Sequence, residues 1–197
     1  MSNMESLNTE SLFSLEIVVD KLMLSKTQCR FPAIAFRLLD FPTLIIYHVE
    51  PGLGDIIKSK IKMDPLFRLG HHIPELLDKD GSFPVKKGKS CLIKMTGNAL
   101  LSHLQSTPLY VMIIDSFPDT PKLIGNSTIP LDNTMEKLHT DMCHTGLALP
   151  VVQGEKGCYK IYNLMGKEVG YITLGTRNIH FVISFDLLIT QSSLCVA

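Results

Sequence analysis

The stretch LFSLEIVVDKLML, residues 12–24, alternates apolar and polar side chains through its first half. Phe13, Leu15 and Ile17 share one face, and polar residues stand between them, until Val18 breaks the pattern on the other face. Successive side chains of a β-strand point to opposite faces of the sheet. This period of two therefore predicts a strand with one face buried in a core.

Seven further runs carry the signature of strands, and turn residues separate them. They are Ala33–Val49 with a bulge or bend at Pro42, Lys89–Thr96, Leu109–Asp115, Lys122–Leu131, Leu147–Val152, Cys158–Leu164 and Glu168–Arg177. Gly166-Lys167 is expected to form a hairpin turn between the last two. Eight short strands at this spacing predict an all-β fold, an eight-stranded antiparallel β-sandwich with short helical insertions.

Alternation within the strands also predicts which side chains fill the core of this sandwich. The expected core residues are Phe13, Leu15, Ile17, Phe36, Leu38, Val111, Ile113, Ile129 and Ile172.

Three segments do not follow the period of two. Asn98–Gln105 predicts a short helix capped by Asn98 and ended by Thr107-Pro108. Residues 55–81, interrupted by prolines and a glycine, are expected to form an insertion loop with one or two helical turns, and Asp132–Thr145 a loop with a single turn. The expected organisation is a flexible N-terminus (1–11), one domain (12–177) and a divergent C-terminal tail (178–197).

Composition narrows the classes of protein that the chain can belong to. Lys+Arg and Asp+Glu number 19 each, which disfavours a dedicated nucleic-acid binder because such proteins carry a basic excess. Five cysteines at irregular spacing predict no disulfide framework and favour a reducing compartment. No signal peptide is expected from the polar start, and no apolar run reaches the length of a membrane-spanning helix.

Gly88-Lys89-Ser90 resembles the end of a phosphate-binding loop. That motif requires a glycine five residues before the second glycine, so that the chain turns its amides toward phosphate. Phe83 occupies the position. We therefore expect no nucleotide site, and the sequence predicts neither a cofactor nor catalytic residues.

Two groups of residues are candidates for metal sites. His139, Cys143, His144 and Cys158 lack the paired, tight spacing of zinc ligands. Asp115 and Asp119 supply two carboxylates in one loop, whereas calcium takes six to eight oxygen ligands. We expect no metal to bind at either place.

Three stretches resemble the C2 family. Leu109–Asp115 followed by Lys122–Leu131 is similar to its pattern of apolar strand, Asp, loop, Ile-Gly and strand. Val169–Leu174 is similar to its terminal Gly-x-Ile-x-Leu strand. The resemblance implies that the predicted sandwich is of C2 type.

A sharper resemblance lies in LFSLE (12–16), PAIAFRLLDFPTL (32–44) and GKSCL (88–92). These strings resemble the N-terminal domain of the microtubule-associated protein 10 family. The resemblance implies microtubule (tubulin) binding and stabilisation in cell division and cytokinesis. It further implies a place in the cytoplasm and cytoskeleton, at centrosome, spindle and midbody, with other cytoskeletal or centrosomal partners possible.

A surface that meets an acidic partner needs exposed cations. The dense candidates are Lys58, Lys60, Lys62, Lys86, Lys87 and Lys89. Lys58, Lys60 and Lys62 share a face if their segment is extended, but only Lys58 and Lys62 do so if it is helical. Three alternatives stay open: the lysines contact anionic lipid without calcium, they only protect sheet edges, or the chain is a hydrolase with an unrecognised site.

Overall fold

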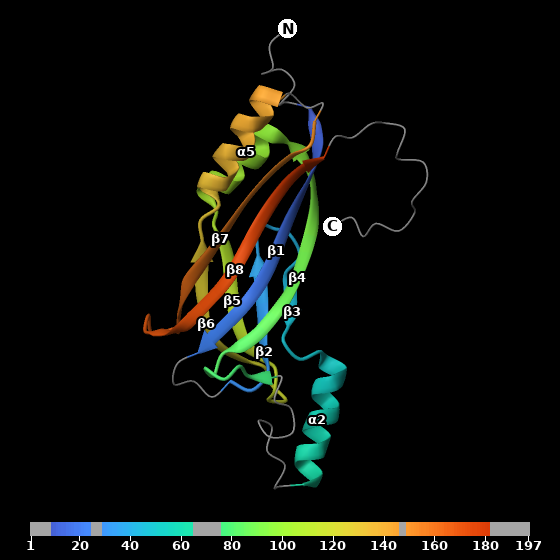
Figure 1. Cartoon of the computed structure of the whole chain (residues 1–197), viewed down its shortest axis with the longest axis vertical. Coiled ribbons are helices and arrows are strands. Elements are labelled where there is room, and N and C mark those ends of the chain that lie inside the picture. The colour runs from blue at the N-terminus through green and yellow to red at the C-terminus, as the bar shows by residue number, and fades with distance from the viewer. Residues whose placement is uncertain (1–8, 25–28, 65–75, 146–148, 182–197) are drawn as a thin grey trace, which may run out of the picture.

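Figure 1 shows the computed structural model, which describes residues 9–24, 29–64, 76–145 and 149–181. The strands are β1 (Glu10–Leu24), β2 (Pro32–Arg37), β3 (Leu44–Tyr47), β4 (Phe83–Thr96), β5 (Leu109–Asp115), β6 (Lys122–Ile129), β7 (Val151–Tyr162) and β8 (Glu168–Phe181). The helices in these ranges are α2 (Pro51–Met63), α4 (Gly97–Ser106) and α5 (Asp132–Thr145).

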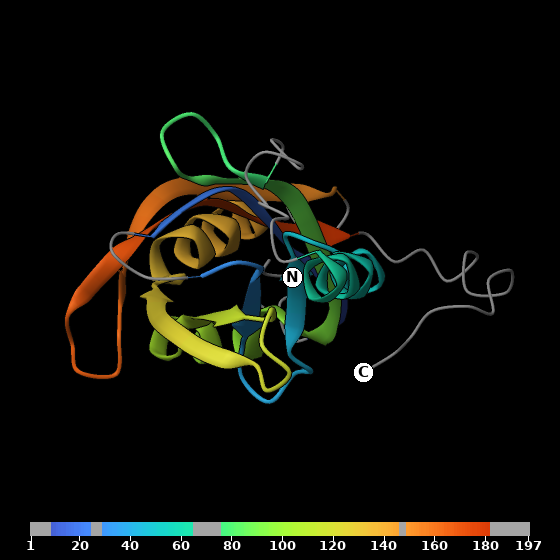
Figure 2. The same ribbon diagram turned by 90° about the horizontal axis from the view of Figure 1, so that it is seen from below.

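The eight strands form one sheet in the order β3-β2-β5-β6-β7-β8-β1-β4. Every paired neighbour is antiparallel. The sheet curls until its halves face each other across one core, as Figure 2 shows from below. The predicted eight-stranded antiparallel β-sandwich is confirmed.

The two halves of the sheet are joined unequally. β1 pairs with β4 and β8 along almost its whole length, whereas β6 and β7 meet at a single register pair, Asn126 with Tyr162. Gly125 lies beside this junction, where an added Cβ would stand 2.7 Å from Ile161 Cγ2 and 2.8 Å from the Tyr162 carbonyl oxygen. The sheet therefore bends there around a position that leaves no room for a side chain.

The core contains the side chains that the alternation predicted. Phe13, Leu15 and Ile17 from β1 are at most 2% exposed, and they join residues of β2, β5, β6 and β8 in one cluster. All nine expected core residues are buried. The period of two was a reliable guide in strands such as β5, which has one face on the core and a more exposed second face, whereas β2 is buried on both faces from Pro32 to Phe36.

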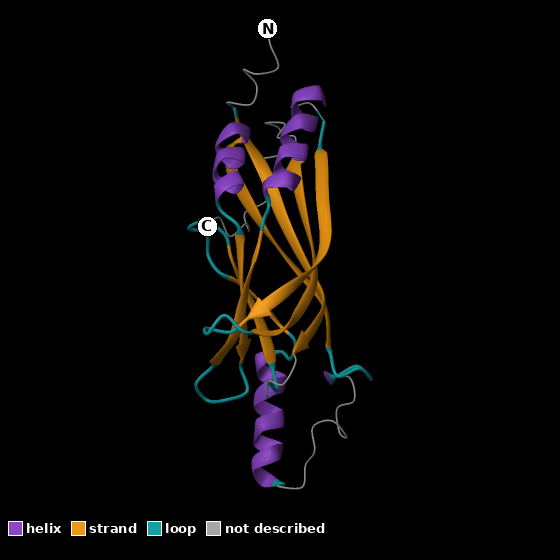
Figure 3. Ribbon diagram, turned by 90° about the vertical axis from the view of Figure 1, so that its left-hand side faces the viewer, coloured by secondary structure: helices purple, strands orange, loops and turns teal. Residues whose placement is uncertain are grey.

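α4 and α5 lie side by side over one end of the sheet, and α2 extends from the opposite end (Figures 1 and 3). The cap of α4 is Thr96 and not Asn98, since the Thr96 hydroxyl accepts a hydrogen bond from the Ala99 amide at 3.2 Å. No helix within the described ranges is both long and apolar enough to cross a bilayer.

Several predicted boundaries were wrong. Asp132–Thr145 forms a full helix rather than a loop, because Met135, Leu138 and Met142 recur at helical spacing and are buried. The expected insertion loop at 55–81 begins inside α2, and its residues 65–75 lie outside the described ones. Instead of one bent strand at Pro42, β2 and β3 form an antiparallel pair.

The ends of the domain also differ by a few residues from the expected ones. β1 starts at Glu10, inside the expected flexible N-terminus, and β8 runs to Phe181, beyond the expected domain end at 177. Residues 1–8 and 182–197 of the expected terminus and tail lie outside the described part of the chain. The hairpin turn is confirmed: the Asn163 amide donates to the Lys167 carbonyl at 2.9 Å.

Candidate interaction surface

α2 carries half of the predicted lysines, and its sequence explains where it begins and how it is held. Pro51 occupies the first turn, where a missing N–H costs nothing. Ile57 is buried and packs in a small cluster with Phe31, Val49 and Leu76. This inner face fixes the helix against the end of the sheet.

A second side of α2, next to the face that carries Ile57, is apolar and exposed. Leu53, Ile56 and Met63 have 51%, 55% and 86% of their surface exposed. With 3.6 residues per turn, these three and the exposed Lys60 fall within about 80° of the helix circumference. We call Leu53, Ile56, Lys60 and Met63 the outer stripe of α2.

The remaining lysines of α2 lie away from the outer stripe. The ammonium group of Lys58 donates a hydrogen bond to the Ser116 carbonyl at 3.0 Å and ties the helix to the β5–β6 loop. Lys62 is exposed four residues further on. The helical alternative of the prediction therefore holds, and Lys58, Lys60 and Lys62 do not act as one face.

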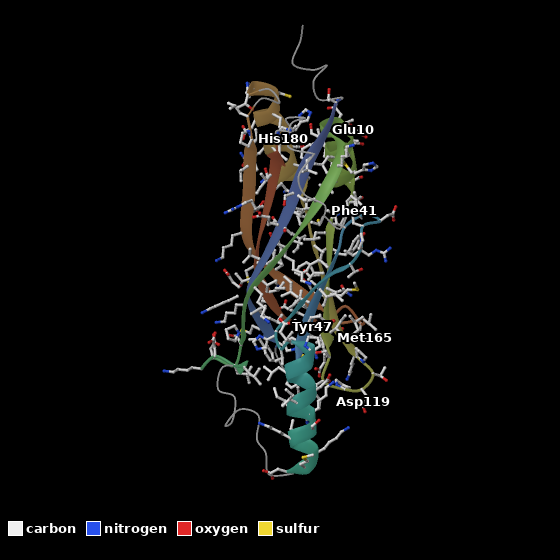
Figure 4. The ribbon with its side chains drawn as sticks, turned by 90° about the vertical axis from the view of Figure 1, so that its right-hand side faces the viewer. Glu10, Phe41, Tyr47, Asp119, Met165 and His180 are labelled. Atoms are coloured by element: carbon white, nitrogen blue, oxygen red, sulfur yellow. The ribbon has the colours of Figure 1, made fainter. Side chains whose placement is uncertain are left out.

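Lys87 is held inside the fold. Its Nζ donates to the carbonyl of Tyr47 at 2.7 Å, to that of His48 at 3.2 Å and to Glu50 Oε1 at 2.7 Å. These contacts join β4 to the chain between β3 and α2, where the two edges of the sheet meet. In Figure 4, Tyr47 lies directly beside the start of α2. Lys87 therefore acts as a structural link between β4 and the segment that precedes α2.

Lys86 and Lys89 flank this link and are exposed. Lys86 has φ of 46°, and the β1–β4 register shifts there, opposite the segment from Val19 to Lys21. Lys89 lines a hollow of about 240 Å³ at the seam where the edge strands β3 and β4 meet, together with Lys87 and Glu50.

The lysines of α2 are separated from those at the seam. Lys60 lies about 15 Å further along the axis of α2 than Glu50, from the rise per residue. The predicted lysines thus form two groups and no compact patch.

A second hollow lies on the outer face of β1, β7 and β8. It has a volume of about 430 Å³, and Gly154, Gly175 and Val18 contribute to its wall. The charges beside it are mutually neutralised, since Lys156 pairs with Asp20 and Arg177 with Glu16. Glu155, which accepts a hydrogen bond from Thr134, also lines the hollow, so the hollow offers no basic excess for an acidic partner.

Asp115 is a structural residue of the β5–β6 loop. It is 4% exposed. Its carboxylate accepts hydrogen bonds from the backbone amides of Phe31 at 3.0 Å, Phe117 at 3.0 Å and Arg30 at 3.3 Å. Because these bonds engage both oxygens, Asp115 holds the loop to the start of β2, and Asp119 is exposed nearby.

The candidate zinc ligands do not converge. His139 and Cys143 face each other on α5, with Nδ1 and Sγ 3.9 Å apart, while Cys158 is exposed on β7. Within the part of the chain that the structure describes, no group of three or more His, Cys, Asp or Glu side chains has the geometry of a metal site.

A half-buried histidine, His48, and a buried one, His180, lie at opposite ends of the sheet. Burial lowers the pKa of His48, and nearby Lys87 lowers it further, although a hydrogen bond to the Leu76 carbonyl opposes the shift. Burial also lowers the pKa of His180, which is 1% exposed and stacks at 5.4 Å from Phe13. His180 Nδ1 has no hydrogen-bond partner among the described residues. Both rings favour the neutral state.

The outer stripe of α2 consists of residues that the sequence analysis did not single out. Leu53, Ile56 and Met63 repeat at i, i+3 and i+10, which is a helical signal. It was obscured because Gly52 and Gly54 disfavour helix and Pro65 follows. The contacts of Lys87 with Tyr47 and Glu50 were not indicated by the sequence, since these partners lie 37–40 residues away along the chain.

Comparison with solved structures finds C2 domains at low similarity. A C2 domain of plant extended synaptotagmin 1 matches 88% of this chain and 98% of its own, with 8% identity and a TM-score of 0.46. The calcium-bound pair of C2 domains of extended synaptotagmin 2 matches over 92% of this chain and 50% of its own, with 10% identity and a TM-score of 0.47. The C2 type expected from the sequence is the fold named in both descriptions, and similarity at this level carries no argument about function.

Comparison with known sequences, unlike that with solved structures, identifies the family of this chain. Bovine (Bos taurus) microtubule-associated protein 10 is 30% identical in an alignment of 206 positions, which covers 88% of this chain and 20% of that protein. The human (Homo sapiens) protein of the same name is 26% identical in an alignment of 203 positions, which covers 86% of this chain and 19% of that protein. The chain spans about a fifth of the length of these relatives.

The family described as "Microtubule associated protein 10, N-terminal domain" matches residues 25–181. The match includes β2 through β8 and all three described helices. This chain therefore belongs to the microtubule-associated protein 10 N-terminal domain family.

Proposed function

We propose that this chain is a non-catalytic interaction module that associates with microtubules. The observation that carries the proposal is the family match over residues 25–181, with relatives that are named microtubule-associated protein 10. The arrangement of side chains supports it, because cations and apolar groups are exposed on a projecting helix while the candidate metal ligands stay apart.

The family also supports a finer proposal. The chain contributes to microtubule stabilisation during cell division and cytokinesis, in the cytoplasm and on the cytoskeleton, at centrosome, spindle and midbody. Since it spans about a fifth of its relatives' length, it acts there as one part of a larger binding apparatus. Tubulin is the favoured partner, and other cytoskeletal or centrosomal proteins are further ones.

Electrostatics give the module a means of contact with an acidic polymer. Exposed cations steer association with a surface of opposite charge. Five of the six predicted lysines have no ion-pair partner among the described residues. Lys58 is held by its hydrogen bond to the Ser116 carbonyl, and the other four are exposed: Lys60, Lys62, Lys86 and Lys89. Binding through such exposed charges weakens as salt rises, because they are screened over about 8 Å at physiological ionic strength.

Co-sedimentation with stabilised microtubules tests this proposal. The unmutated chain is expected to pellet with microtubules at low salt and less at high salt. Replacing Lys60, Lys62, Lys86 and Lys89 by Ser should weaken binding. The matched control replaces two exposed lysines elsewhere, Lys122 and Lys137. A chain that stays in the supernatant at every salt concentration would refute the proposal.

A second candidate function is calcium-independent docking on anionic lipid. The tip of the β7–β8 hairpin exposes 77% of Leu164 and 88% of Met165, beside the exposed Lys167. Apolar tips next to cations are typical of segments that enter the lipid interface. Flotation with phosphatidylserine vesicles separates the two functions: binding that Leu164→Ser and Met165→Ser abolish favours lipid.

A further inference from the structure

α2 presents a binding surface that is already ordered. Its inner face is fixed by Ile57 against Phe31, and its flank is fixed by the hydrogen bond from Lys58 to the Ser116 carbonyl. The start of the helix is linked to β4 by the ion pair between Glu50 and Lys87. A partner that binds the free side of α2 therefore loses little entropy in ordering the helix.

The free side has the form of a ridge. α2 extends beyond the end of the sheet (Figures 1 and 3), and Leu53, Ile56 and Met63 are exposed on it. Apolar residues at i, i+3 and further turns of a helix are the anchors by which helices enter apolar grooves of other proteins. The outer stripe, about 80° wide, fits such a groove.

The charge and the width of the outer stripe favour a protein groove over a lipid surface as the partner of α2. Lys60 stands within the outer stripe, and Lys62 is exposed on another side of the helix. Neither forms an ion pair with a described residue. Helices that lie in a lipid interface bury a wide apolar face, whereas the outer stripe of α2 is narrow and the apolar residues next to it, Ile57 and Ile61, pack against the cluster that contains Phe31. A narrow apolar stripe with a central cation matches a groove with an acidic rim.

We infer that α2 is the element that docks this chain on its partner: Leu53, Ile56 and Met63 enter an apolar groove whose acidic rim receives Lys60. This inference rests on the proposed function, under which the acidic, grooved partner is the microtubule surface. The groups at the seam, Lys86 and Lys89, steer the approach from the base of the helix.

The test uses two triple variants with matched exposure. The stripe variant carries Leu53→Ser, Ile56→Ser and Met63→Ser. The control variant carries Val18→Ser, Leu92→Ser and Val152→Ser, which are 46%, 43% and 50% exposed on the outer face of the sheet. The stripe variant is expected to bind microtubules at least tenfold more weakly than the unmutated chain, and the control variant within twofold of it.

A single charge reversal gives a second readout that leaves the apolar residues in place. Lys60→Glu should weaken binding by about tenfold, and Lys137→Glu, exposed on α5 at the other end of the molecule, should not. Lys60→Glu also decides the matter if the stripe variant unfolds.

The outcomes separate this inference from the proposed function. If the unmutated chain binds microtubules and the stripe variant and Lys60→Glu bind equally well, α2 is not the docking element while the proposed function stands. If the control variant loses as much affinity as the stripe variant, the inference also fails. If the unmutated chain does not bind microtubules, both fail.

Discussion

Lys87 Nζ lies 2.7 Å from Glu50 Oε1, so that a side chain of edge strand β4 is paired with the residue immediately before α2. The same ammonium group also bonds the carbonyls of Tyr47 and His48. These contacts close the seam of the curled sheet and set the position of the projecting helix. The seam and the proposed docking element are therefore coupled through one lysine.

Replacing Lys87 by Met removes the ammonium group and keeps the aliphatic stem. We expect the free energy of unfolding to fall by about 1 kcal/mol, since several partly exposed charge-assisted bonds are lost. Urea denaturation measures the change. Lys89→Met, two residues along the same strand and without an ion-pair partner among the described residues, is the control and should cost almost nothing. Equal losses would show that Lys87 is not a structural link.

Lys86 is held with φ of 46°, a left-handed conformation that favours glycine. Lys86→Gly should therefore raise the free energy of unfolding by about 0.5 to 1 kcal/mol, because the strain at Cβ disappears. Ser90→Gly, in the regular part of the same strand, should lower it by a similar amount. Denaturation curves of both variants check the prediction, and a loss of stability in Lys86→Gly would contradict it.

Removing the Asp115 carboxylate should weaken the fold without changing its response to calcium. Asp115→Ala leaves the buried Phe31 amide without its acceptor, so we expect a loss of about 2 kcal/mol. The control is Asp119→Ala, at an exposed position. Millimolar calcium should leave the unfolding temperature of the unmutated chain unchanged. Calorimetric detection of micromolar calcium affinity would overturn this account of the loop.

Acid should destabilise the protein through His48, which is half-buried, and His180, which is buried. Burial lowers the pKa of His48 and of His180 below the usual 6.5. The unfolded chain therefore binds more protons than the folded one as pH falls through 6.5 toward the folded values, and the free energy of unfolding decreases over that window. Above 6.5 this contribution to stability is fully present.

Urea titrations at neutral and mildly acidic pH measure this dependence. His48→Gln and His180→Gln should each flatten it, because a titrating group is removed. The exposed His103→Gln should leave it unchanged. An unfolding free energy independent of pH between neutral and mildly acidic solution would show that neither ring is neutral by virtue of the fold.

The sandwich could be predicted because the alternation of apolar and polar residues within a strand shows which of its faces is buried. Phe13, Leu15 and Ile17 alternate with polar residues, and that local pattern determines which face meets the core. α5 could have been predicted from Met135, Leu138 and Met142, but its polar composition resembled a loop. The role of Lys87 could not be predicted, since it depends on contacts with Tyr47 and Glu50 that only the closed sheet creates.

Zero-length cross-linking tests the central claim, that the chain binds microtubules through α2, most directly. Carbodiimide joins an ammonium group to a carboxylate only where the two are already in contact. We predict cross-links from Lys60 or Lys62 to acidic residues of tubulin, found by mass spectrometry, that disappear with Lys60→Ser and Lys62→Ser. Cross-links from Lys94 or Lys137 at the α4 and α5 end, with none from α2, would contradict the account.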